Sequence, residues 1–466
     1  MKELLRSVFY VFLIALVSIS TGCGNSKKRE LNRLLVELAA ADQTIDASDW
    51  KRLTDFLDAQ KVNFSDLYDD GTLDVKAVED YVNDFFAHRR PAQTIRFIGV
   101  GGQELSFHVF IERSGSMTPY DSPAGDGSFH AAIMALRNNL PGHSKVENIG
   151  EQGYTDFRKI FDQILNRTGK NQISILVTDM IYSVKDMNGV NPQKVFNGAQ
   201  GMINAVFKDE VKKKAMLVIK MDGSYNGPYY AYDNSVRQLN GRRPYYIIIV
   251  GDNDSMSRLT MDKELLSFSR FTELKGYENM CLFAADEIYQ PYYSLLLSNP
   301  AIRGRFQPER GQEDQIKNIN GMEIDRNSGD IRLALAVDLG HMLIDKGYLT
   351  DPANYRVESD DEVTIREIRP INDKDVTPAE KKYLNKATHI FILEMKQMRN
   401  DQEVSVQLLN RLPAWVEASS TDDDIHGLQQ GTTFGLKYLL QGIYNSYQKN
   451  TEGTPCYFEL KMKFND

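Results

Sequence analysis

The sequence has few cysteines and no excess of positive charge, and both features exclude classes of protein. Three cysteines in 466 residues are too few for a framework of disulfides. The 55 lysines and arginines are outnumbered by 64 acidic residues, and the net charge of −9 comes without a basic block. Because phosphate neutralisation supplies most nucleic-acid affinity, we expect no nucleic acid among the partners. With 42% hydrophobic and 26% charged residues, the chain is also neither disordered nor fibrous.

The longest hydrophobic run of the sequence lies at its N-terminus. Lys2 and Arg6 precede the apolar residues 8–19, and small residues lead to Cys23. A cationic start, about a dozen apolar residues and small residues before a cut site are typical of an export signal. With Cys23 in this position, the segment resembles a bacterial lipoprotein signal. The resemblance implies removal of residues 1–22, a lipid on Cys23 and a membrane-anchored protein of the cell envelope.

Further features indicate where the protein resides and how it is divided. Gly24 follows the cysteine, whereas enterobacterial lipoproteins retained in the inner membrane have Asp there, so the resemblance favours the outer membrane. Cys281 and Cys456 remain, and two separate thiols are favoured over one disulfide. About three domains are expected from the length. We expect a signal at 1–22, a tether at 23–30, a helical module at 31–90, a central domain at 94–285, a connector at 286–321 and a β-rich region at 322–466.

Hydrophobic patterning predicts a multidomain protein of the α/β plus β class. In the central domain, strands that are apolar throughout, such as 173–177 and 245–250, alternate with amphipathic helices. Runs of this kind indicate strands buried on both faces, which predicts a mainly parallel, doubly wound (Rossmann-like) sheet. Apolar residues alternate with other residues at 331–339 and 404–408, which predicts an antiparallel β-sandwich in the C-terminal region.

Oxygen-bearing side chains gather where two strands of the predicted central sheet end. Glu112, Ser114 and Ser116 follow the first strand, and Asp179 follows a later one. Thr155 lies between them, just before an amphipathic helix. Ligands of open α/β sheets bind at the carboxyl ends of strands. Hydroxyl and carboxylate oxygens without His or Cys suit Mg²⁺, and Mn²⁺ is a second choice.

This pattern resembles the metal-ion-dependent adhesion site (MIDAS) of von Willebrand factor A domains, in which D-x-S-x-S follows the first strand. Ser114, Ser116, Thr155 and Asp179 match the family in order, and Glu112 stands where the family has Asp. The resemblance covers about residues 94–285. It implies metal binding by the three hydroxyls and two acids, and an acidic residue of a protein partner as the last ligand.

The expected function is therefore adhesion to a protein partner, without catalysis. A scaffold or assembly lipoprotein with a vestigial metal site is the alternative. A metal-dependent hydrolase that uses the same acidic edge is the third hypothesis, although the sequence shows no general base pair. His108 and His130 flank the site and could serve as a base for Ser114, but a histidine in or beside a strand is more often structural. An acidic run at 422–424 is interpreted as a solvated turn.

Overall fold

The computed structural model shows a mixed α/β protein with several sheets, some of which contain parallel strands. It describes residues 26–40, 43–89, 92–100, 105–139, 144–150, 156–182, 190–208, 210–261, 272–312, 315–382, 384, 387–397, 401–449 and 455–465. The predicted signal at 1–22 and the predicted lipidation site Cys23 lie outside these ranges. No helix within them combines the length and apolar character needed to cross a membrane.

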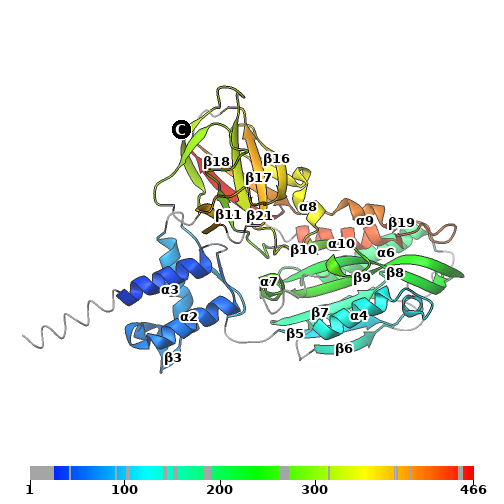
Figure 1. Cartoon of the computed structure of the whole chain (residues 1–466). Coiled ribbons are helices and arrows are strands. Elements are labelled where there is room, and N and C mark those ends of the chain that lie inside the picture. The colour runs from blue at the N-terminus through cyan, green and yellow to red at the C-terminus, as the bar shows by residue number, and fades with distance from the viewer. Residues whose placement is uncertain are drawn as a thin grey trace, which may run out of the picture.

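Helices build most of the N-terminal part (Figure 1). A first helix spans residues 26–39, so the end of the predicted tether is helical. The other elements are β1 (Thr44–Ile45), α2 (Ala47–Ala59), β2 (Tyr68–Asp69), β3 (Thr72–Leu73), α3 (Val75–Ala87) and β4 (Arg96–Phe97). Asp46 and Asp74 cap α2 and α3 by accepting backbone hydrogen bonds from the first turn. Leu35, Leu57 and Val82 lie in the shared core of these helices.

A six-stranded sheet forms the centre of the molecule, in the strand order β10-β8-β9-β7-β5-β6. Its strands are β5 (Ser106–Glu112), β6 (Ser144–Ile149), β7 (Gln172–Thr178), β8 (Lys214–Tyr230), β9 (Val236–Asp252) and β10 (Tyr277–Phe283). The helices beside it are α4 (Ser128–Asn139), α5 (Phe157–Arg167), α6 (Pro192–Phe207) and α7 (Asn253–Met261). Side chains from α4 and α7 join the core on one face, and side chains from α5 and α6 join the core on the other.

The prediction of a mainly parallel sheet is wrong for half of these strands. β5, β6 and β7 are parallel, but β8 and β9 form a long hairpin, and β9, β8 and β10 pair in antiparallel fashion. In β9, Ile247 and Ile249 lie in the core on one face, and Ile248 and Val250 lie in the core on the other. An apolar run therefore indicates that both faces are covered, and it does not determine strand direction.

Two further sheets form the C-terminal part. The four-stranded sheet contains β11 (Tyr293–Leu295), β14 (Ile331–Val337), β17 (His389–Met395) and β16 (Val363–Pro370). The five-stranded sheet contains β12 (Arg305–Pro308), β13 (Asn318–Glu323), β21 (Cys456–Phe464), β18 (Gln402–Leu409) and β15 (Tyr355–Glu358). Their pairings are antiparallel except for β13 with β21. Apolar residues of both sheets share one core, and the predicted connector 286–321 supplies strands to each sheet.

One segment of the C-terminal part returns to the central sheet (Figure 1). It comprises α9 (Ala414–Ala418), β19 (Ser420–Thr421), β20 (Thr433–Phe434) and α10 (Leu436–Gln448); the short helix α8 (Lys346–Thr350) lies outside it. Leu440 and Ile443 of α10 lie in the same core as Ile203 of α6 and Phe283 of β10. Residues 411–449, which we call the return segment, thus cover the α5 and α6 face of the six-stranded sheet.

Candidate functional site

The two strands that were expected to carry the metal ligands end side by side. β5 and β7 are parallel neighbours, with Phe110 opposite Leu176, so Glu112 and Asp179 lie at the same edge of the sheet. The described candidates are all buried there: the exposed fractions are 2% for Glu112, 7% for Ser114, 8% for Ser116 and 0% for Asp179. Thr155, the fifth candidate ligand, lies outside the described residues.

The loop after β5 brings its two serine hydroxyls together. Ser114 Oγ and Ser116 Oγ lie 2.9 Å apart and share a hydrogen bond. In an octahedral Mg²⁺ site with ligand distances of about 2.1 Å, neighbouring oxygens are separated by about 3.0 Å. The two hydroxyls therefore already have the separation that adjacent ligands of such an ion require.

Glu112 is engaged by a residue that the sequence reasoning did not assign to the site. The hydroxyl of Thr178, the last residue of β7, donates a hydrogen bond to Glu112 Oε2 and accepts one from Met180 N at 3.0 Å. Thr178 itself is fully buried. Because side chains alternate along a strand, Glu112 and Thr178 share the face of Phe110 and Leu176. Glu112 is thus held by the neighbouring strand, which suits an acid that reaches a cation through water.

Asp179 has one carboxylate oxygen without a partner. Its Oδ1 accepts a hydrogen bond from Ile181 N at 3.1 Å, whereas the buried Oδ2 has no hydrogen-bond partner among the described residues. Burial raises the pKa of Asp179, and the charge of Arg243 and the Ser116 hydroxyl act in the opposite direction. Met180 has a φ of 54°, so the chain turns sharply just after Asp179. A buried, unpartnered carboxylate oxygen beside hydroxyls can accept a cation.

A buried arginine lies near this edge, and its burial could not be predicted from sequence patterning. Arg243, on β9, has an exposed fraction of 1%, and none of its guanidinium nitrogens has a hydrogen-bond partner among the described residues. Its guanidinium carbon lies 4.3 Å from the ring centroid of Tyr229 and 5.2 Å from that of Tyr225. Such ring faces stabilise a desolvated cation. An Arg–Arg pair beside proline is typical of a polar turn, so sequence patterning could not reveal this burial.

The far end of the β8–β9 hairpin covers the loop that carries the two serines. A Cβ atom on Gly115 would lie 3.0 Å from the ring of Tyr230, and one on Gly227 would lie 2.8 Å from Pro119 Cγ. Tyr230 retains an exposed fraction of 37%. The end of the hairpin, including Tyr230, therefore packs against the loop that carries the two serines.

The return segment holds the hairpin end through Asp424. Tyr229 Oη donates a hydrogen bond to Asp424 Oδ2, and Tyr232 N donates one to Oδ1 at 3.3 Å. Arg237 donates to the backbone carbonyls of Asp424 and Ile425. Asp424 is fully buried, so the interpretation of residues 422–424 as a solvated turn is wrong at this position. Burial raises the pKa of Asp424, and the Tyr229 hydroxyl has the opposite effect.

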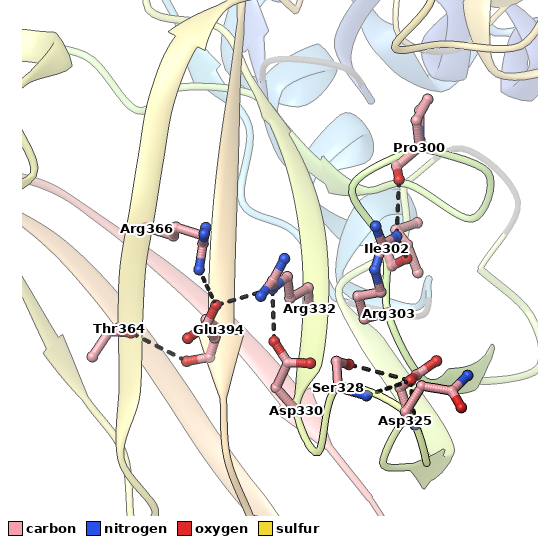
Figure 2. A network of polar contacts seen from close by, with 11 residues as sticks. Pro300, Ile302, Arg303, Asp325, Ser328, Asp330, Arg332, Thr364, Arg366 and Glu394 are labelled. Atoms are coloured by element: carbon pink, nitrogen blue, oxygen red, sulfur yellow. Dashed lines mark hydrogen bonds and ion pairs between the residues drawn. The ribbon is translucent and has the colours of Figure 1, made fainter.

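A second polar cluster among the described residues consists of ion pairs between side chains of the C-terminal part. Figure 2 shows a ladder across β14, β17 and β16, in which Glu394 binds Arg332 at 2.9 Å and Arg366 at 2.7 Å, and Arg332 also binds Asp330. His108 and His130 lie within 4.0 Å of Glu147 and Asp121, respectively. No group of three or more His, Cys, Asp or Glu side chains in the described ranges could hold a metal ion. Any metal site at the sheet edge therefore depends on the serine hydroxyls.

Comparison of the chain with known protein families, curated proteins and solved structures finds no match.

Proposed function

We propose that the protein is a lipid-anchored component of the bacterial cell envelope that binds a protein partner through a Mg²⁺-dependent edge of its central sheet. The observation that carries the proposal is the 2.9 Å separation of Ser114 Oγ and Ser116 Oγ beside the buried edge residue Asp179. In this proposal the central unit is similar to a von Willebrand factor A domain. The lipid on Cys23 anchors it, with the outer membrane as the proposed location.

Each edge residue has a role in this proposal. Ser114, Ser116 and Asp179 bind the cation directly, and Thr155 joins them as the resemblance implies. Glu112 acts through a bound water because its Oε2 accepts the hydrogen bond of Thr178. Hydroxyl and carboxylate oxygens favour Mg²⁺, or Mn²⁺ of similar geometry, over zinc or copper. An Asp or Glu of the partner fills the remaining position.

Access to this position requires movement of the hairpin end. Ser114 and Ser116 are less than a tenth exposed, and the ring of Tyr230 packs against Gly115. The proposal therefore includes displacement of Tyr230 when the partner carboxylate enters. Tyr230→Gly should remove this barrier and speed association with the partner.

A pull-down from envelope extracts tests the proposed function. The tagged full-length protein in detergent is incubated with extract either in millimolar Mg²⁺ or in excess EDTA, which removes the divalent cation. We expect partners recovered in Mg²⁺ to be lost in EDTA and to be lost from Asp179→Asn in Mg²⁺. Recovery that is equal in all three conditions would contradict the proposal.

A scaffold or assembly protein with a vestigial metal site is the second candidate. Two observations favour it: Ser114 and Ser116 are buried, with Tyr230 packed against Gly115 between them, and the charge of Arg243 acts on Asp179. A resident cation such as Arg243 reduces the need for a metal. Partners of a scaffold should be recovered in EDTA and by the Asp179→Asn variant. The same pull-down therefore separates the two functions.

A further inference from the structure

We propose that the buried guanidinium of Arg243 acts as the counter-charge of two carboxylates. One is Asp179 at the candidate cation site, and the other is Asp424, which holds the end of the β8–β9 hairpin to the return segment. Arg243 thereby links the cation site to the contact between the hairpin and the return segment. The inference rests on the proposed function, because it concerns how occupation of the same edge is sensed. Under this proposal a divalent cation and the Arg243 guanidinium compete for Asp179. Binding of the cation shifts the guanidinium towards Asp424.

The position of Arg243 is unusual for an arginine. Its exposed fraction is only 1%, and its guanidinium nitrogens have no hydrogen-bond partner among the described residues. A guanidinium cannot lose its proton under ordinary conditions, so its charge persists in this buried place. Buried charges require compensating charges or dipoles, and here the faces of Tyr225 and Tyr229 supply only part of the compensation.

One compensating group is Asp424, reached through Tyr229. The ring of Tyr229 lies against the guanidinium, and its hydroxyl donates to Asp424 Oδ2. The charge of Arg243 favours the ionised form of Asp424. Arg237 also favours it, but Arg237 is partly exposed and donates its hydrogen bonds to backbone carbonyls. Of these two arginines, Arg243 is thus the buried one whose charge stabilises the ionised form of Asp424.

The other compensating group is Asp179. Thr178 is opposite Tyr246 in the antiparallel pair of β7 and β9, so the chain after β7 runs beside the part of β9 that holds Arg243. The hydroxyl of Tyr120, six residues after Ser114, donates to the carbonyl of the neighbouring Pro244. Arg243 and Asp179 nevertheless form no ion pair within 4.0 Å, and Asp179 Oδ2 has no hydrogen-bond partner among the described residues.

A charge count indicates what this region can accept. Glu112, Asp179 and Asp424 are buried carboxylates, and Arg243 is a buried guanidinium whose charge favours the ionised forms of Asp179 and Asp424. With all three acids ionised, the three negative charges exceed the one positive charge by two, the charge of one divalent cation. A divalent cation at the sheet edge would balance the charges of Glu112 and Asp179, and the charge of Arg243 would then balance that of Asp424.

Titration with Mn²⁺ by isothermal calorimetry tests the link on the purified full-length protein. Asp424→Asn keeps the size of the side chain and an acceptor for Tyr229 but removes the charge. Asp423→Asn is the matched control, because Asp423 is half-exposed and accepts hydrogen bonds within its own turn. We expect Asp424→Asn to weaken Mn²⁺ binding by about tenfold or more relative to the control, because Arg243 then favours Asp179 alone.

Removal of the competing cation should have the opposite effect. Arg243→Met preserves much of the apolar stem, and we expect it to bind Mn²⁺ about tenfold more tightly than the unmodified protein, provided that circular dichroism shows it to be folded. If Arg243→Met does not fold, the comparison of Asp424→Asn with Asp423→Asn decides alone. Equal Mn²⁺ affinities of these two variants would overturn the inference while leaving the proposed function intact. Absence of Mn²⁺ binding by the unmodified protein would overturn both.

Discussion

Truncation of Ile443 tests whether the return segment belongs to the core of the central sheet. Ile443 lies on α10, is fully buried and shares a core with Ile203 and Phe283. Replacing a buried isoleucine by alanine costs about 2–5 kcal/mol, depending on how far the cavity can collapse. A Cβ atom on Gly442 would lie only 3.2 Å from Ile203 Cγ2, so α10 and α6 are already in close contact. Since the helices cannot move much closer, we expect Ile443→Ala to cost about 3–4 kcal/mol.

The chain contains a built-in reporter for this measurement. Trp415 lies on α9 of the return segment, and the second tryptophan, Trp50, lies in the helical part. In a Trp50→Phe background, urea unfolding followed by tryptophan fluorescence reports on the return segment alone. Gln441→Ala is the control: among the described residues the Gln441 side chain donates its hydrogen bond to the exposed Asn445, so its loss should change the free energy of unfolding by less than about 0.5 kcal/mol. A loss below about 1 kcal/mol for Ile443→Ala would refute the packing described for α10.

Three further predictions concern the backbone, the thiols and a buried lysine. Gly276→Ala should destabilise the protein by about 3 kcal/mol in urea unfolding, because Gly276 has a φ of +93° and a Cβ atom there would lie 2.3 Å from the carbonyl oxygen of Asp222. An unchanged midpoint of the urea unfolding curve would contradict this contact. Burial raises the pKa of Cys456 to about 11 and also raises the pKa of Cys281. At pH 8 both thiols should therefore react with an alkylating reagent at least about tenfold more slowly in the folded protein than after unfolding, as mass spectrometry can measure. Burial lowers the pKa of Lys317 from 10.5 to about 8. Between these two pH values the unfolded chain binds a proton that the folded protein does not, so the free energy of unfolding should rise with pH across this range. Lys317→Met should lack this contribution, and parallel pH profiles of the two proteins would argue against it.

Local patterning in the sequence was sufficient to find many of the elements. The amphipathic spacing of residues 157–165 corresponds to α5, and Asn191 followed by Pro192 marks the start of α6, where Asn191 accepts a hydrogen bond from Gln193 N. The alternation at 331–339 corresponds to β14. These features depend on neighbours in the sequence, which is why they can be read without the fold.

Long-range packing could not be predicted in this way. The antiparallel direction of β9 follows from its hairpin with β8, and the position of the return segment follows from contacts between α10 and α6. At the candidate site, the spacing predicted Glu112 and Asp179 at one edge because they lie at the ends of the neighbouring strands β5 and β7. The burial of Arg243 and Asp424 depends on residues that lie far away in the chain, such as Tyr229, and no local pattern encodes it.

Calorimetric titration of the purified protein with Mg²⁺ and Mn²⁺ tests the central claim most directly. The unmodified protein is compared with Ser114→Ala, which removes one of the paired hydroxyls, and with Asp179→Asn, which removes the charge of the buried edge carboxylate. Both substitutions are nearly isosteric, so a loss of binding would report on the ligands. The account predicts one divalent cation per chain, with binding lost or at least about tenfold weaker in both variants. Absence of binding by the unmodified protein, or equal binding by all three proteins, would contradict it.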